Sequence, residues 1–147
     1  MKRLILLFML VPALFLMACT PSERIVPETD PEATTWTEID ATVLAAKLAA
    51  GDDFILIVSS SVCLSCLEFQ PILETFISTY GIIVYKIESG GEFPVTNAVF
   101  PYEFTPTIAV FAAGELLVSV NPADQPRPFE TIEKLVDYLD QYVQIPN

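Results

Sequence analysis

The stretch FILIVSSSVCLSC, residues 54–66, decides the fold, because a strand, a polar turn and two cysteines follow one another in it. Residues 54–58 are apolar and rich in β-branched side chains, which predicts a strand buried on both faces. Over residues 64–80 apolar side chains recur at helical spacing, and Pro71 is expected to kink this helix. The sequence therefore predicts a Cys-x-x-Cys motif at the point where a buried strand gives way to a helix.

The segments on either side of residues 54–80 are also predicted to alternate between helices and strands. On the N-terminal side, a capping pattern at Thr37 predicts a helix that ends at Gly51. On the C-terminal side we expect a strand over 82–87, an irregular connection over 89–105 with at most one short helix, a β-hairpin over 107–120 and a closing helix from Pro128 that ends by Pro146. This order predicts an α/β fold with a mixed central β-sheet flanked by helices on both faces.

The spacing of Cys63 and Cys66 carries the chemistry of the chain. Unpaired backbone N–H groups and the dipole of a helix N-terminus stabilise a thiolate, so Cys63 is the expected nucleophile. The two intervening residues bring Cys66 within reach of a mixed disulfide on Cys63, which Cys66 can then resolve. Two other interpretations stay open: a static structural disulfide, and half of a zinc site. The zinc site is disfavoured because the chain has no His and no second cysteine pair.

The composition excludes several other classes of protein. A length of 147 residues suggests a single ordinary domain. With 19 acidic and 7 basic residues the formal charge is −12, which excludes a protein that binds nucleic acid by neutralising phosphates. The absence of His removes Ser-His-Asp and Cys-His catalysis. We therefore expect no nucleic-acid partner, no metal site and no cofactor other than a redox-active Cys63–Cys66 disulfide.

The first residues predict export and lipid attachment. Residues 1–18 combine Lys2 and Arg3 with an apolar run, as in a signal peptide. The sequence LMAC that ends at Cys19 resembles the lipobox of bacterial lipoproteins, which implies that Cys19 receives diacylglycerol and that residues 1–18 are removed. An ordinary signal peptide, or a signal anchor, with an unmodified Cys19 is the alternative interpretation.

The segment that follows, residues 19–35, is rich in Pro and acidic side chains and poor in apolar ones. This composition predicts a disordered tether between the lipid anchor and a domain over residues 36–147. We therefore expect an extracytoplasmic protein that is lipid-anchored to a bacterial membrane and lies in a compartment where disulfides persist.

Over residues 36–147 the sequence resembles the thioredoxin family. The matching features, in order, are the cysteines at 63 and 66, Pro71, the strand IVYKI at 83–87 with Lys86, the segment FTPT at 104–107 and Gly114 in the hairpin turn. The resemblance implies a thioredoxin-like fold in which Pro106 is a cis-proline beside the dithiol. It also implies that the backbone of Thr105 pairs with an extended client segment, and that Leu64 and Ser65 contact the client.

The sequence departs from the family at positions that matter for the mechanism. Ile57 stands where thioredoxins usually carry a buried Asp that moves protons to and from the second cysteine. Lys86 consequently lacks its usual carboxylate neighbour, and we expect it to pair elsewhere or to reach solvent. Leu64 and Ser65 replace the familiar Gly-Pro, and Ser65 is a candidate hydrogen-bond donor to a sulfur.

The resemblance implies a thiol:disulfide oxidoreductase. In the reducing direction, Cys63 attacks a disulfide of a client protein and Cys66 resolves the mixed disulfide. A membrane thiol reductase is the implied electron donor. The alternative is a non-catalytic binding module with a static disulfide between Cys63 and Cys66, and copper(I) transfer by the dithiol is a minor third interpretation.

Overall fold

The computed structural model describes residues 24–90 and 101–146. Cys19 and most of the connection expected over 89–105 lie outside these residues. The elements, in chain order, are β1 (Thr37–Glu38), α1 (Ala41–Ala50), β2 (Phe54–Ser59), α2 (Leu64–Tyr80), β3 (Val84–Glu88), β4 (Thr107–Ala112), β5 (Glu115–Val120), the 3₁₀ turn η1 (Arg127–Phe129) and α3 (Ile132–Leu139). Within the described part of the chain, no helix is long and apolar enough to span a bilayer.

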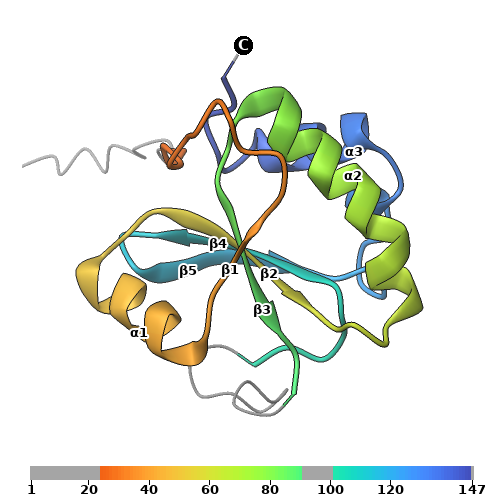
Figure 1. Cartoon of the computed structure of the whole chain (residues 1–147), viewed down its shortest axis with the longest axis horizontal. Coiled ribbons are helices and arrows are strands. Elements are labelled where there is room, and N and C mark those ends of the chain that lie inside the picture. The colour runs from red at the N-terminus through yellow and green to blue at the C-terminus, as the bar shows by residue number, and fades with distance from the viewer. Residues whose placement is uncertain (1–23, 91–100, 147) are drawn as a thin grey trace, which may run out of the picture.

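The five strands form one mixed sheet in the order β1-β3-β2-β4-β5 (Figure 1). β1 and β2 run parallel to β3, whereas β4 is antiparallel to both β2 and β5. β2 is the central strand, and its residue Ile57 lies between Lys86 of β3 and Ile108 of β4. The predicted mixed sheet is therefore confirmed.

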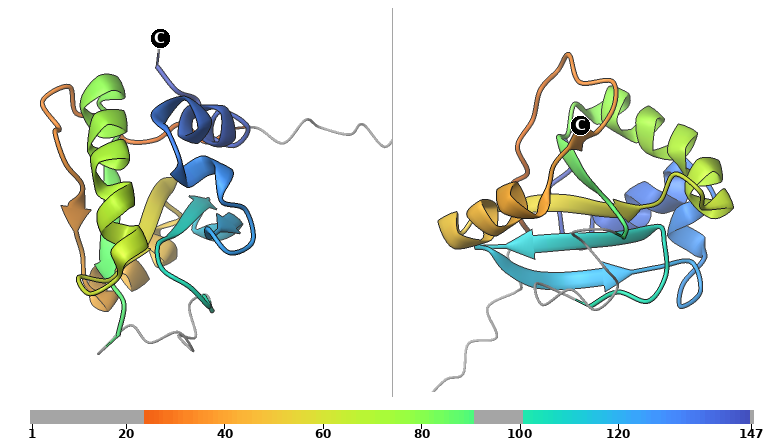
Figure 2. Two further views of the ribbon diagram at one scale, coloured as in Figure 1. Left: turned by 90° about the vertical axis from the view of Figure 1, so that its right-hand side faces the viewer. Right: turned by 60° about the horizontal axis from the view of Figure 1, so that its bottom comes forward.

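Alternate residues of β2 enter two separate cores, one on each face of the sheet. Ile55 and Ile57 belong to the larger core, which α2 and α3 complete with Phe76, Leu135 and other apolar side chains. Phe54, Leu56 and Val58 belong to the smaller core, which α1 covers through the fully buried Leu44. Figures 1 and 2 show α1 apart from α2 and α3, as the sequence predicted for a sheet flanked on both faces.

The start of the first helix was predicted too early. Thr37 does not cap a helix but lies in β1, where it pairs with Tyr85 of β3. Asp40 is the N-cap of α1, and its carboxylate accepts a hydrogen bond of 2.8 Å from the Val43 N–H. Pairing with the free edge of β3 outweighs the local capping signal, because it satisfies backbone groups along that edge.

The closing helix begins later and ends earlier than expected. Pro128 lies in the 3₁₀ turn η1, not in the first turn of the helix. Thr131 caps α3 by accepting a hydrogen bond from the Lys134 N–H, and α3 ends at Leu139 rather than near Pro146. An extended Thr131 separates the two elements, so the Pro-initiated turn does not continue into α3.

The hairpin turn lies where the sequence predicted it. Ala113 and Gly114 both have positive φ, 50° and 76°, which is the conformation of a two-residue type I′ turn. A Cβ on Gly114 would lie 2.2 Å from the Leu48 carbonyl oxygen at the end of α1. The turn thus needs glycine both for its backbone conformation and for the close approach of α1.

The expected disordered tether is wrong for residues 24–35, which pack against the domain. Ile25 exchanges backbone hydrogen bonds with Tyr142 and Gln144, and its side chain is 3% exposed in the larger core. Asp30 donates to the Gly81 carbonyl, and Ile83 donates to the carbonyl of Glu28. A few apolar side chains, Ile25, Pro27 and Ala33, and a set of backbone hydrogen bonds therefore hold a segment whose composition alone predicts disorder.

This packing predicts that Ile25→Ala destabilises the domain. Removing a buried Ile side chain costs about 2–5 kcal/mol, because it leaves a cavity as well as losing apolar burial. The neighbouring Val26 is 66% exposed, so Val26→Ala is the matched control and should stay within about 0.5 kcal/mol of wild type. Urea unfolding followed through the single tryptophan, Trp36, measures both values. Equal effects of the two substitutions would show that the segment does not pack.

Candidate active site

The two cysteines of the motif form a disulfide at the first turn of α2. Cys63 is the N-cap residue, and its Sγ accepts a hydrogen bond of 3.1 Å from the Cys66 N–H. The preceding turn is held from two sides: the Cys63 N–H donates to the Ser60 carbonyl at 3.2 Å, and the Ser61 N–H donates to Glu88 Oε1 at 2.7 Å. The sulfur of Cys63 thus lies at the positive end of the helix dipole, where negative charge is stabilised.

The two sulfurs differ in access to solvent. Cys63 is partly exposed, whereas Cys66 is 6% exposed and belongs to the buried residues of α2. In a dithiol, an incoming disulfide therefore reaches Cys63 first. The roles of nucleophile for Cys63 and resolving thiol for Cys66 stay predictions, and they require a difference in access of this kind.

The segment before β4 faces the disulfide. The Thr105–Pro106 peptide bond is cis, and Pro106 is buried while Thr105 is partly exposed. The Thr105 carbonyl oxygen lies 3.2 Å from Cys63 Sγ. The Thr107 hydroxyl donates to the Phe104 carbonyl at 2.6 Å and holds the turn that presents this segment. The structure thus brings the predicted residues Thr105 and Pro106 together with the cysteines.

Leu64 and Ser65, the two residues between the cysteines, are both exposed, and they differ in their contacts. Leu64 is 71% exposed, and Val62, Leu67 and Phe104, which are also exposed, lie within four residues of Cys63 or next to Thr105 in the chain; we call these four side chains the apolar rim. Ser65 turns inward instead: its Oγ lies 3.2 Å from Cys63 Sγ and 3.2 Å from the Thr105 carbonyl oxygen. The sequence predicted a contact of Ser65 with sulfur, but no sequence signal predicted its contact with Thr105.

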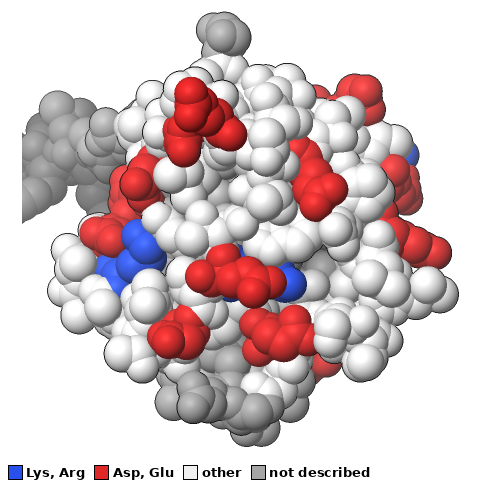
Figure 3. Space-filling view, in the orientation of Figure 1, with Lys and Arg blue, Asp and Glu red and all other residues white. Residues whose placement is uncertain are grey.

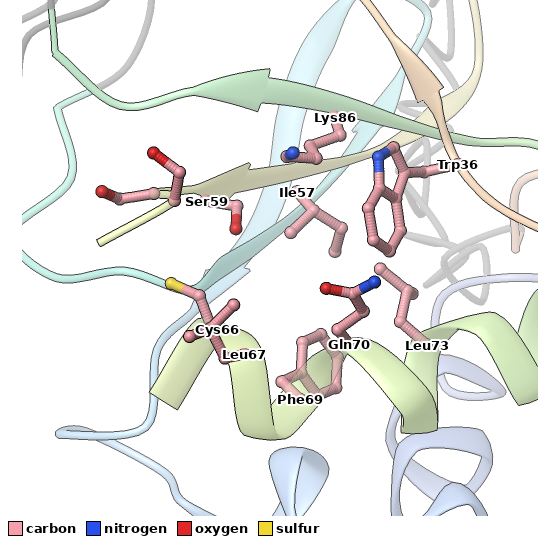
Figure 4. A pocket seen from close by; sticks show the side chains of 11 residues that line it. Trp36, Ile57, Ser59, Cys66, Leu67, Phe69, Gln70, Leu73 and Lys86 are labelled. Atoms are coloured by element: carbon pink, nitrogen blue, oxygen red, sulfur yellow. The ribbon is translucent and has the colours of Figure 1, made fainter. Parts of the chain in front are cut away.

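A cavity of about 170 Å³ lies behind the disulfide and reaches Cys66 (Figure 4). Figure 4 shows side chains of α2 along one side, Lys86 and Trp36 on the other, and Ile57 and Ser59 between them. None of the described residues that line it is an Asp or Glu. Ile57 is buried at the position where the family resemblance implied a missing carboxylate.

Lys86 pairs elsewhere, one of the two outcomes expected for it. Its ammonium lies 3.0 Å from Glu38 of β1 and 3.9 Å from Glu88, and 5.0 Å from the centre of the Trp36 ring. The hydrogen bond and charge of Lys86 lower the pKa of Glu38 below its ordinary value. Sequence analysis missed Trp36 and Glu38 as neighbours of Lys86, because it placed the chain from Thr37 onward in a helix instead of in β1.

Among the described residues, no group of three Cys, Asp or Glu side chains is placed to hold a metal ion. The site therefore offers sulfur chemistry, backbone groups and a serine hydroxyl.

Comparison with known proteins identifies the fold. The sequence matches no protein-family model and no curated protein sequence. Among solved structures, a mutant thioredoxin from Halobacterium salinarum is similar, with a TM-score of 0.59, 17% identity, and coverage of 78% of this chain and 96% of that one. Thioredoxin f from spinach chloroplast has a TM-score of 0.57 and 20% identity over 74% of this chain and 86% of its own.

A third similar structure is a complex of ferredoxin:thioredoxin reductase and thioredoxin f2, with a TM-score of 0.56, 18% identity, and coverage of 74% of this chain and 94% of that one. These likenesses show that the chain has a thioredoxin-like fold, as the sequence predicted. In this fold the Cys63–Cys66 disulfide lies at the start of α2.

The different access of the two sulfurs predicts selective alkylation. When the chain is reduced and treated with iodoacetamide near neutral pH, Cys63 should react at least about tenfold faster than Cys66, because Cys63 is partly exposed at the helix N-terminus, which favours the reactive thiolate, whereas Cys66 is buried. Peptide mass spectrometry measures the two rates. In concentrated urea the rates should converge, and faster labelling of Cys66 in the folded protein would contradict the assignment.

Proposed function

We propose that this protein is a thiol–disulfide oxidoreductase that reduces disulfides of client proteins through Cys63 and Cys66. The observation that carries the proposal is the disulfide at the N-terminus of α2, with one accessible and one buried sulfur, facing the cis peptide bond at Pro106. Each feature matches a requirement of the exchange reaction: a stabilised thiolate, an internal resolving thiol and a place for an extended peptide.

The reaction follows from the positions of the two sulfurs. The Cys63 thiolate attacks one sulfur of the client disulfide, forms a mixed disulfide and releases the other client sulfur as a thiolate. Cys66 loses its proton and attacks Cys63 Sγ, which re-forms the Cys63–Cys66 disulfide and releases the second client sulfur. Two electrons pass to the client, and an external dithiol must return two electrons to the protein.

The surface around Cys63 supports binding of an extended client segment. The partly exposed Thr105 offers a backbone edge, and the apolar rim of Val62, Leu64, Leu67 and Phe104 offers apolar contact. Acidic side chains dominate the face shown in Figure 3, with Lys and Arg at few places. This charge favours clients whose segments near the disulfide carry apolar and basic residues rather than acidic ones.

The direction of electron flow is proposed from the charges near the sulfurs. The loop over 59–66 contains no Lys or Arg, so the thiolate of Cys63 gains stabilisation from backbone groups rather than from a neighbouring cation. Modest stabilisation of the thiolate favours a reductant over a strong oxidant. One similar structure contains a thioredoxin together with its reductase, and for this chain we propose a membrane thiol reductase as the dithiol donor.

The proposed location is the outer side of a bacterial membrane, with a lipid anchor at Cys19. The support comes from the sequence: a short apolar leader over 1–18 and the LMAC segment that resembles a lipobox. Two or more acyl chains hold a protein stably on a bilayer, which a single chain does not. The compartment would also keep the Cys63–Cys66 pair in exchange with disulfides rather than permanently reduced.

Redox equilibration and trapping test the enzymatic proposal. The full chain, kept in detergent, is equilibrated in graded thiol–disulfide buffers, and we expect a reversible potential near about −270 mV rather than near about −120 mV. Cys66→Ser should accumulate mixed disulfides with proteins of the exported fraction, because no resolving thiol remains, whereas Cys63→Ser should trap none. A Cys63–Cys66 disulfide that does not exchange and has a reduction potential below roughly −300 mV, together with a Cys66→Ser variant that traps no client, would contradict the enzymatic proposal. The chain would then be a binding module with a static disulfide.

Metabolic labelling tests the anchor. The wild-type chain should incorporate a radioactive fatty acid and should sediment with membranes. The Cys19→Ala chain should not incorporate it, because the Cys19 thiol is the proposed site of diacylglycerol attachment. Cys63→Ala is the matched control and should keep the label. Equal labelling of the wild type and Cys19→Ala would contradict lipid attachment at this residue.

A further inference from the structure

The hydroxyl of Ser65 lies between two acceptors that belong to different parts of the site. Its Oγ is 3.2 Å from Cys63 Sγ and 3.2 Å from the Thr105 carbonyl oxygen. A serine hydroxyl carries a single proton, so it donates to only one of the two acceptors at a time. The oxidation state of Cys63 changes the strength of one acceptor, the sulfur. It therefore determines which of the two acceptors receives the hydrogen bond from Ser65.

In the disulfide state the carbonyl is the better acceptor. A neutral disulfide sulfur is a weak acceptor, whereas a backbone carbonyl is a strong one. The Ser65 hydroxyl accordingly donates to Thr105, and the carbonyl that faces the client site is occupied from within the protein.

In the reduced state the sulfur of Cys63, now a thiolate, becomes the stronger of the two acceptors. A hydrogen bond to a charged acceptor is roughly twice as strong as one between neutral groups. The Cys63 thiolate would also lie close to the Thr105 carbonyl oxygen, which is 3.2 Å from the sulfur, and these two negative ends repel each other. Donation from Ser65 to the thiolate relieves this repulsion, and it adds a second donor to the Cys66 N–H that already reaches the same sulfur.

We propose that Ser65 is a redox-linked positioning residue that caps the Thr105 carbonyl while the cysteines are oxidised and donates to the Cys63 thiolate once they are reduced. Reduction then removes an internal donor that competes with the N–H of a client, which still carries a disulfide, for this carbonyl oxygen. Oxidation, at the end of the cycle, returns the hydroxyl to Thr105 and weakens the hold on the reduced client. The inference rests on the proposed function for its meaning, but its geometry does not depend on any particular client.

The redox step itself balances without further groups. A donor dithiol gives two electrons, the Cys63–Cys66 bond breaks, and the products are the donor disulfide, the Cys63 thiolate, the Cys66 thiol and one released proton. Ser65 gains and loses no proton in this step. It only changes the acceptor of its hydrogen bond.

The pKa of Cys63 is the first readout. In a background with both Cys19→Ala and Cys66→Ala, thiolate absorbance during a pH titration of the full chain in detergent reports Cys63 as the remaining cysteine. Adding Ser65→Ala should raise the pKa of Cys63 by about one unit, a tenfold loss of thiolate, because a hydrogen bond to a charged group is lost. Ser65→Thr keeps a hydroxyl and should restore the lower value, and Ser61→Ala, in the same loop, should leave the pKa unchanged.

The Thr105 carbonyl is the second readout. With ¹³C at this carbonyl, NMR of the otherwise wild-type chain should show a shift towards the value of a non-hydrogen-bonded carbonyl on chemical reduction. In Ser65→Ala the oxidised protein should already have the shifted value, so that most of the redox dependence is lost. An unchanged pKa of Cys63, together with equal redox-dependent shifts in the two proteins, would overturn the proposal.

These readouts separate the two proposals, because they use chemically reduced protein and no client. Trapping of clients by Cys66→Ser, with no effect of Ser65→Ala, would keep the oxidoreductase and remove the role of Ser65. Loss of both Ser65 effects and of all trapping would overturn both.

Discussion

The register between β2 and β4 is the constraint on which the active site depends. Val58, near the end of β2, pairs with Thr107, the first residue of β4. Because the strands are antiparallel, the chain that leaves β2 towards Cys63 and the chain that enters β4 through Pro106 lie at the same end of the sheet. The strand register thus brings the sulfurs and the cis peptide bond to one place, where Cys63 and Ser65 contact the Thr105 carbonyl.

The packing of α2 then makes the two cysteines unequal. Cys66, Phe69 and Leu73 are the buried residues of the N-terminal half of this helix, and they follow one another at the three- and four-residue intervals of one helix face. Cys66 consequently points into the protein with the core residues, whereas Cys63 precedes the helix as its N-cap and stays at the rim. The difference in access between Cys63 and Cys66 is thus a consequence of helix periodicity.

The sequence predicted the parts of the fold that are set by strong local patterns. The buried strand over 54–58, the helix over 64–80 and the Ala113-Gly114 turn are each specified by apolar periodicity or by turn chemistry, and they appear as predicted. β1 was missed because two residues carry no period of their own and form a strand only through pairing with β3. The packing of residues 24–35 was missed for a related reason, since two buried residues, Ile25 and Pro27, are too few to give a recognisable pattern.

The features of the candidate site also divide into those that local sequence patterns predict and those that depend on the tertiary structure. The cysteine pair and the segment around Pro106 are visible in the sequence because their residue types and spacing are distinctive. The second contact of Ser65, with Thr105, spans 40 positions and depends on strand register, so no local pattern carries it. The partners of Lys86 were hidden for the same reason, because Glu38 reaches it only through the parallel pairing of β1 with β3.

The cavity beside Cys66 determines how this thiol loses its proton. With Ile57 in the wall, and with no carboxylate among the described residues that line the cavity, no acidic side chain there can accept the proton directly. The polar groups that remain are serine hydroxyls, Gln70 and the Lys86 ammonium, which is held by two carboxylates outside the lining. If Cys66 resolves a mixed disulfide as proposed, its proton must therefore pass to solvent or to the departing client sulfur, and the charge of Lys86 is already paired with Glu38 and Glu88.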